Sequence, residues 1–232
     1  MPTENDTPET DRESVLEQTP GKGRSPTPRA IEPSVPDEFG LVQVWWGDGK
    51  GKTTAAMGMG FRAAGHGYRV HMVQLMKGGA SSVEDARGEY NAIEAFPGFT
   101  YENLGHYGWH GMRDGSEEDD HAAKARSGFE RLKELVATAP ETAEPISLDA
   151  PPEEGLHMLI VDEILYAVNR ELIPPTELLA LIESKPAHLE LVLTGGHEEP
   201  TYLSDHADLI SEVRKMKHPI DAGQRARKGT EY

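Results

Sequence analysis

Short apolar runs, rich in β-branched and aromatic residues and bounded by turn-forming residues, recur along this chain. A run of this kind predicts a strand that is buried in a sheet. We predict strands in the stretches 41–46, 68–76, 99–104, 156–163 and 188–196. In residues 202–218 we predict a short helix, then a further strand, and finally a basic segment that leaves the strand.

Between these runs the apolar positions follow the helical period instead. The clearest case is the segment 118–138. Its apolar stripe consists of Ala122, Ala125, Phe129, Leu132 and Val136. Further helices are predicted at 55–67, 164–172 and 175–184. Strands that alternate with helices indicate an α/β fold, with a mostly parallel central sheet and helices on both faces.

Two segments differ in composition from this pattern. Residues 1–38 hold seven prolines, nine acidic and four basic residues. Such a segment buries too little apolar surface to offset the entropy lost on ordering, so we predict a disordered acidic tail. Residues 139–155 are rich in proline and acidic residues and predict a surface insertion. The remaining chain, 39–232, is then one domain with that insertion.

Charge and composition argue against several classes of protein. The 232 residues include 23 Lys and Arg against 40 Asp and Glu, a net charge of −17. This charge repels nucleic acid and anionic membrane surfaces, so neither is an expected partner. No apolar run approaches the roughly 20 residues of a membrane span, and no signal peptide is evident. Without cysteine, neither disulfides nor thiolate metal sites are possible, and we expect a cytoplasmic protein.

A stretch dense in glycine and lysine lies between the first predicted strand and the first predicted helix. It consists of Gly47, Asp48, Gly49, Lys50, Gly51, Lys52, Thr53 and Thr54. Glycines let successive backbone N–H groups turn toward an anion, and the N-terminus of the following helix adds its dipole. Lys52 would bring a positive charge to phosphate oxygens, and the Thr53 hydroxyl would be placed to bind Mg²⁺. We interpret the stretch as the ATP-binding loop of a P-loop NTPase-like fold.

The spacing of this loop departs by one residue from the usual phosphate-binding pattern. Counted back from Gly51, the pattern G-x-x-x-x-G-K-[ST] requires a glycine where the chain has Trp46. The first glycine comes one residue later, at Gly47. A glycine-rich turn with a solvent-exposed lysine is the alternative interpretation. The strand before the loop and the helix after it favour nucleotide binding.

Two acidic residues end the most apolar of the predicted strands. Asp162 and Glu163 follow the run 157–161. Ligands of an open α/β sheet bind at the carboxyl ends of its strands, where the phosphate loop also lies. Carboxylates there can hold Mg²⁺, so we predict a metal site formed by Thr53, Asp162 and Glu163. The alternative is an ordinary acidic start of a helix.

Motifs that extend well beyond the loop resemble one family of ATP-dependent enzymes. They are GDGKGKTTAA at 47–56, FRAAGHGYRV at 61–70, GEYN at 88–91, VDEILYA at 161–167 and ADLISEVRKMKHPIDAGQRARKGTEY at 207–232. Together they resemble the P-loop ATP:corrinoid adenosyltransferases, which are cob(I)yrinic acid a,c-diamide adenosyltransferases. The resemblance covers 41–232, and its C-terminal motif is far more specific than the phosphate loop.

The resemblance implies an activity and its substrates. Members of the family transfer the 5′-deoxyadenosyl group of ATP to Co(I) of a corrinoid and release triphosphate, in adenosylcobalamin biosynthesis or salvage. The resemblance also implies a P-loop fold, usually as a homodimer, Mg²⁺ bound with ATP, and a reductase that donates electrons. The catalytic residues that it implies here are Lys52, Thr53 and Glu163. Because the family's loop is also one residue short at its first glycine, the resemblance implies the irregular spacing that Trp46 and Gly47 give this loop.

The family carries an aromatic-x-aromatic pair near the corrin face. Counted from the GEYN motif, the family spacing implies that Tyr107 and Trp109 face the corrinoid. The other possible pair is Phe99 and Tyr101, which we interpret as strand core. Gly196-His197 stands where the family usually has Arg-Gly.

Two readings from other classes remain open at this point. One is a RecA-like P-loop NTPase that hydrolyses ATP to drive a partner. The other is a nucleotide-binding regulatory module without chemistry. The products distinguish the three interpretations. An adenosyltransferase forms triphosphate and a cobalt–carbon bond, an NTPase forms ADP and phosphate, and a regulatory module leaves ATP unchanged.

Overall fold

A computed structural model describes residues 29–76, 88–105, 118–139 and 144–230. Its centre is a six-stranded sheet in the order β3-β2-β4-β5-β1-β6, in which every pair of neighbours is parallel. The strands are β1 (Val42–Trp46), β2 (Val70–Gln74), β3 (Phe99–Asn103), β4 (Met158–Asp162), β5 (Glu190–Thr194) and β6 (Leu209–Glu212). Each strand lies inside a stretch predicted from the sequence, and the prediction of an α/β fold is confirmed.

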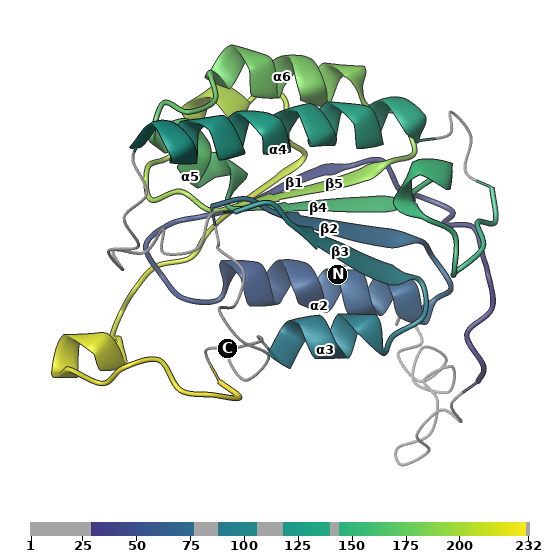
Figure 1. Cartoon of the computed structure of the whole chain (residues 1–232), viewed down its shortest axis with the longest axis horizontal. Coiled ribbons are helices and arrows are strands. Elements are labelled where there is room, and N and C mark those ends of the chain that lie inside the picture. Colours follow the sequence, from purple (N-terminus) through teal and green to yellow (C-terminus); the bar gives the residue numbers. More distant parts are fainter. Residues whose placement is uncertain (1–28, 77–87, 106–117, 140–143, 231–232) are drawn as a thin grey trace, which may run out of the picture. The chain divides into compact units, whose positions relative to one another are not determined.

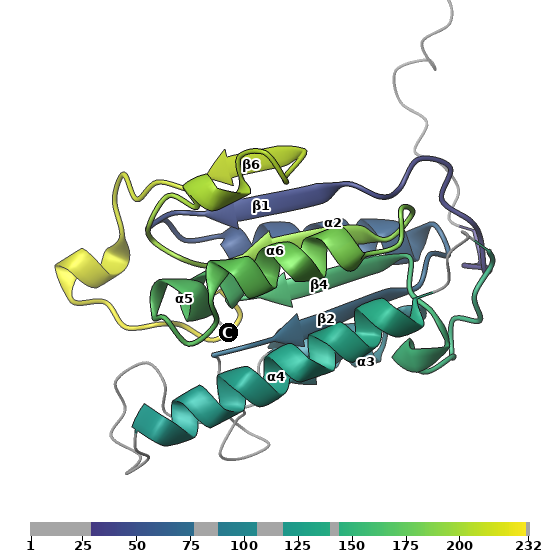
Figure 2. The same ribbon diagram turned by 90° about the horizontal axis from the view of Figure 1, so that it is seen from above.

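Helices cover both faces of this sheet (Figure 1). On one face lie α2 (Lys52–Gly65) and α3 (Gly88–Glu94). On the other face lie α4 (Glu118–Thr138), α5 (Ile164–Asn169) and α6 (Pro175–Ser184), which Figure 2 shows from above. Short 3₁₀ turns follow at η2 (Pro152–Glu154), η3 (Thr201–Leu203) and η4 (Pro219–Ala222). None of the helices in the described ranges is long and apolar enough to cross a membrane.

Four of the five residues in the predicted apolar stripe of α4 are buried against the sheet, and the fifth, Ala122, is only partly buried. Ala125, Phe129, Leu132 and Val136 are buried in the core that α4, α5 and α6 share with the strands. Burying a side chain such as Leu or Phe stabilises a fold by roughly 1.5–3 kcal/mol, so this stripe accounts for the position of α4. A separate buried cluster forms under α2 on the opposite face.

Three helices differ from the sequence prediction, and one of them is α5, which ends at Asn169 and not at 172. α2 begins at Lys52, whereas the prediction began at 55, because the glycine turn leads directly into the helix. α3 was not predicted, since its seven residues place only Tyr90 and Ile93 in the core. Two apolar positions three residues apart do not establish a helical period.

Residues just before the predicted domain boundary at 38/39 contact the rest of the structure. The compact unit that contains the sheet extends from Ile31 to Tyr232. One such contact is a backbone hydrogen bond from Ser34 N to Gly67 O at 3.0 Å. Gly67 has a φ of 81°, and a Cβ there would lie 1.8 Å from Glu32 O, so only glycine permits this approach.

Buried polar side chains anchor residues 144–155 of the predicted insertion. The guanidinium of Arg69 is buried and donates from Nε to Ala150 O at 3.0 Å and from Nη1 to Gly98 O at 3.0 Å. His157 Nδ1 accepts from Arg69 N at 2.9 Å, and its Nε2 lies 2.7 Å from Glu144 O. These contacts tie the amino ends of β2, β3 and β4 to the segment.

A second polar cluster joins α4 to the edge of the sheet. Arg131 of α4 holds both carboxylate oxygens of Glu102 on β3, with Nε to Oε2 at 3.0 Å and Nη2 to Oε1 at 2.6 Å. Buried His71 places Nε2 3.4 Å from Glu102 Oε1. His71 and then Arg131 lower the pKa of Glu102 to about 2. Burial lowers the pKa of His71, which is therefore neutral near pH 7.

We expect Glu102 to make stability depend on acidity. Its pKa is lower in the folded state than the usual value of 4.5, so its contribution is present above pH 4.5 and is lost toward pH 2. Because Glu102 remains partly exposed, we expect a loss of only about 1 kcal/mol. The free energy of unfolding, measured between pH 6 and pH 3, should fall less steeply in Glu102→Gln than in the wild type.

The control is Glu134→Gln. Glu134 also pairs with Arg131, at 3.4 Å, but is well exposed to water. Its removal should leave the pH dependence of stability unchanged. Parallel pH dependences in Glu102→Gln and the wild type would contradict the prediction.

Candidate functional site

The glycine-rich loop lies at the carboxyl end of β1, between the ends of β5 and β6. Gly47 N donates to Gly196 O at 3.1 Å after β5, and Gly49 N donates to Val213 O at 2.7 Å after β6. Gly47 has a φ of 116°, and a Cβ there would lie 2.4 Å from Val213 O. Only glycine fits this approach, so the neighbouring strands fix the shape of the loop.

Lys52 is the first residue of α2 and folds back over the loop. Its Nζ donates to Gly47 O at 2.6 Å and to Gly49 O at 3.0 Å. α2 has no side-chain hydrogen bond at its N-cap, Gly51, and no acidic residue in its first turn. A helix N-terminus of this kind combines with the ammonium to favour an anion such as phosphate.

Behind the loop, the hydroxyl of Thr53 meets the carboxylate of Asp162. Asp162 is fully buried at the end of β4, and its Oδ1 accepts from Thr53 Oγ1 at 2.8 Å. The same oxygen accepts from Thr194 Oγ1 at 2.5 Å, at the end of β5. The sequence predicted that Thr53 and Asp162 share a site, and the parallel strands bring them together.

Glu163 follows in a left-handed backbone conformation. Its φ is 66° and its ψ is 15°, an arrangement that costs a non-glycine residue on the order of 1–2 kcal/mol. Its N donates to Thr194 Oγ1 at 3.2 Å, and a Cβ on Gly195 would lie 2.8 Å from Glu163 Cα. Strain of this kind is retained at functional sites.

Comparison with known proteins identifies the family. Residues 38–232 match the family described as ATP:corrinoid adenosyltransferase BtuR/CobO/CobP. The chain belongs to this family. ATP-dependent adenosylation of corrinoids is accordingly its activity, and a RecA-like NTPase is not favoured.

Named relatives agree with the family match. The corrinoid adenosyltransferase CobA of Salmonella typhimurium is 32% identical over 201 residues, which cover 84% of this chain and 87% of the relative. The corrinoid adenosyltransferase of Escherichia coli K12 is 31% identical over the same shares of the two chains. That of Pseudomonas aeruginosa is 31% identical over 206 residues, or 84% of this chain and 85% of the relative.

Two loop residues of this adenosyltransferase contact its C-terminal segment. Asp48 Oδ1 accepts from Lys215 N at 2.8 Å, and this hydrogen bond lowers the pKa of the exposed Asp48 carboxyl. Lys50 is exposed, with Nζ 3.5 Å from Thr230 O. The sequence assigned both residues to ATP, whereas the structure turns the Asp48 side chain toward the segment that follows β6.

The aromatic residues assigned to the corrinoid, Tyr107 and Trp109, lie outside the described residues. The alternative pair belongs to β3. Phe99 is buried, with its ring centre 5.1 Å from that of Phe61, and Tyr101 stacks on Tyr90 at 4.5 Å. The interpretation of Phe99 as strand core is confirmed.

The donor set at the loop suits a hard divalent cation. Thr53 and Asp162 offer a hydroxyl and a carboxylate beside the loop, and Glu163 is the next residue along the chain with a second carboxylate. Such oxygen ligands are those that Mg²⁺ prefers. Within the described ranges, no group of three or more His, Asp or Glu side chains is placed to hold a metal. A cation here would therefore need further ligands, and the phosphate oxygens of ATP are of the right chemistry.

Three polar residues near Asp162 were missed by the sequence analysis. Gln74 ends β2, Asn103 ends β3, and Tyr90 belongs to the GEYN motif of α3. For Gln74 and Asn103 a signal was available, because each is a polar residue at the carboxyl end of a strand, the edge of the sheet where the phosphate loop also lies.

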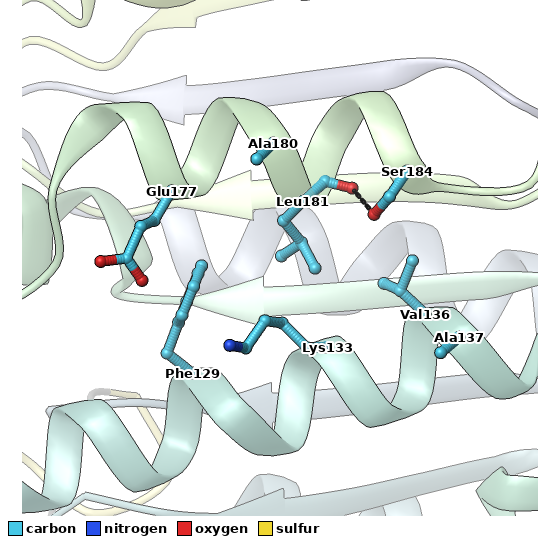
Figure 3. Close-up of a pocket in the computed structure, with 8 residues that line it drawn as sticks. All are labelled: Phe129, Lys133, Val136, Ala137, Glu177, Ala180, Leu181 and Ser184. Carbon is cyan, nitrogen blue, oxygen red and sulfur yellow. Dashed lines mark hydrogen bonds between the residues drawn. The ribbon is translucent and has the colours of Figure 1, made fainter.

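A groove between α4 and α6 is separate from this site (Figure 3). Its volume is about 380 Å³, and none of the residues assigned to ATP, metal or corrinoid lines it. The lining side chains are Phe129, Lys133, Val136, Ala137, Glu177, Ala180, Leu181 and Ser184. Its lining residues belong to α4 and α6, whereas the phosphate loop lies at the carboxyl end of β1.

Proposed function

We propose that this chain transfers the 5′-deoxyadenosyl group of ATP to Co(I) of a corrinoid and releases triphosphate. The observation that carries the proposal is the position of the Lys52 ammonium within the glycine loop, 2.6 Å from Gly47 O and 3.0 Å from Gly49 O. A loop of this kind, at the carboxyl end of a parallel strand, suits a polyphosphate. The family match selects the corrinoid as the second substrate.

The proposed chemistry requires no protein base. The electron pair of Co(I) forms the cobalt–carbon bond at C5′, the C5′–O bond breaks, and its electrons leave with triphosphate. The protein holds C5′ in line with cobalt, which is catalysis by proximity. Lys52, Lys50 and the amides of the loop are the groups that we assign to the growing charge on the leaving group.

Mg²⁺ bound with ATP is part of the proposal. Thr53, Asp162 and Glu163 would hold it, and the bound cation would offset negative charge on the polyphosphate. The direct hydrogen bond between Thr53 Oγ1 and Asp162 Oδ1, at 2.8 Å, supports this assignment because it brings two oxygen ligands together beside the loop.

Several further assignments rest on the resemblance. We propose that Tyr107 and Trp109 face the corrinoid and displace the lower axial ligand of cobalt(II), which makes its reduction easier. A reductase would supply the electrons, in adenosylcobalamin biosynthesis or salvage. We also propose a homodimer in the cytoplasm.

The products of a single incubation test the proposal. With ATP, Mg²⁺ and chemically reduced corrinoid, we expect the visible spectrum of an alkylcobalt product and one triphosphate released for each cobalt–carbon bond. The control omits the protein, which separates catalysis from the spontaneous reaction. Release of ADP and phosphate without alkylcobalt would favour the NTPase reading, and recovery of unchanged ATP would favour the regulatory module.

A further inference from the structure

A continuous chain of hydrogen bonds runs from Asp162 to the end of β3. Asp162 Oδ2 accepts from Gln74 Nε2 at 3.0 Å. Gln74 Oε1 accepts from the Tyr90 hydroxyl at 2.5 Å, and that hydroxyl accepts from Asn103 Nδ2 at 2.7 Å. This series of hydrogen bonds therefore links β2, α3 and β3 to Asp162 of β4, the acid that contacts Thr53.

All donors in this series of hydrogen bonds point the same way, from Asn103 toward Asp162, and the groups at its two ends determine this direction. Asn103 Oδ1 accepts from the backbone N–H of Gly105 at 3.1 Å, so the amide nitrogen of Asn103 must face Tyr90. Tyr90 accepts this bond and gives its single proton to Gln74. Gln74 then presents its amide nitrogen to Asp162, whose ionised carboxylate only accepts.

Burial makes this direction costly to reverse. Gln74 and Asp162 are fully buried, and Tyr90 is 8% exposed. The Tyr90 ring also stacks on Tyr101, at 4.5 Å and an angle of 6°. Where water cannot replace a lost partner, a satisfied polar network holds its members in one arrangement.

We propose that Gln74, Tyr90 and Asn103 are positioning residues for Asp162. They hold Oδ2 of the carboxylate toward β2, so that Oδ1 stays at the hydroxyls of Thr53 and Thr194. This inference rests on the proposed function, in which Asp162 takes part in binding Mg²⁺ with ATP. Residues that orient a metal ligand in this way affect the metal-dependent part of nucleotide binding and leave the direct phosphate contacts intact.

The first test is Tyr90→Phe, which removes only the hydroxyl. Gln74 then loses the donor to its oxygen, so its amide group is held less firmly and its bond from Nε2 to Asp162 Oδ2 fixes the carboxylate less well. We expect the Mg²⁺ concentration for half-maximal ATP binding to rise about tenfold, the lower end of the effect for partners of metal ligands. The affinity for ATP in EDTA should stay unchanged. Isothermal titration calorimetry under both conditions measures the two quantities.

The matched control is Tyr101→Phe. It makes the same change on the neighbouring, stacked ring, whose hydroxyl is not a member of the chain. Both ATP affinities should equal those of the wild type. Equal weakening in Mg²⁺ and in EDTA by Tyr90→Phe, or no change in either, would overturn the inference.

A second variant tests the direction of the chain. Asn103→Asp keeps the acceptor for Gly105 and replaces the donor to Tyr90 with an acceptor. Tyr90 then gives its proton to this carboxylate and no longer to Gln74, so we expect the same tenfold change in Mg²⁺ dependence as for Tyr90→Phe. In a Tyr90→Phe background, Asn103→Asp should cause no further change. A loss that persists in that background would come from the added charge and would contradict the proposal.

Failure of the inference and failure of the proposed function are distinguishable. If the wild type forms no alkylcobalt product, the proposed function fails whatever the variants do. If the wild type is active and both variants keep its Mg²⁺ dependence, only the positioning role fails. Thermal unfolding of each variant establishes that the protein measured is folded.

Discussion

Lys52→Ala is expected to lower kcat/KM for adenosylation by about 100- to 1000-fold, the range for loss of one well-placed group that stabilises developing negative charge. Lys52 Nζ lies within hydrogen-bonding distance of two carbonyls of the loop, Gly47 O and Gly49 O. It is therefore held where the polyphosphate would lie and needs little reorganisation to contact it. The initial rate of alkylcobalt formation, measured over a range of ATP concentrations, gives the value.

The control for this variant is Lys133→Ala. Lys133 lies on α4, pairs with Glu130 at 2.6 Å and is about half exposed. Its loss removes the same charge from a different face of the protein and should leave kcat/KM within about twofold of the wild type. A wild-type rate in Lys52→Ala would show that the loop is not where triphosphate leaves.

Most of the fold could be predicted because its signals are local. A strand buried on both faces is a continuous apolar run, and β4 and β5 are buried at every position. The strand order is not local, because β1 pairs with β5 and β6, far along the chain. The role of Arg69 was also beyond prediction, since its partner Ala150 is 81 residues away.

The candidate site could be predicted in part for the same reason. The phosphate loop is contiguous, and Asp162 and Glu163 end a strand whose direction is known once the sheet is parallel. The contact between Asp48 and Lys215 joins residues 167 positions apart, and nothing near either residue signals it. The left-handed conformation of Glu163 was equally invisible, because glycine is the residue that signals a positive φ and none occurs there.

Glu163→Gly is expected to lower activity strongly and to raise stability. Loss of the carboxylate should lower kcat/KM by about 100-fold or more if Glu163 holds the cation. Glycine adopts a φ of 66° without the crowding of a Cβ, so relief of strain should exceed its higher entropy in the unfolded chain. We expect a net gain of roughly 0.5–1 kcal/mol in the free energy of unfolding, measured with urea.

Two variants separate the carboxylate of Glu163 from its backbone. Glu163→Gln removes the charge but keeps the strained conformation, so it should lose activity without gaining stability. Glu171→Gly relaxes another left-handed residue, with a φ of 59°, in the exposed turn after α5. It should gain similar stability, roughly 0.5–1 kcal/mol, and keep full activity. If Glu163→Gly were no more stable than Glu163→Gln, the strain would not be stored in the backbone. If Glu163→Gly stayed active, the carboxylate would have no part in the reaction.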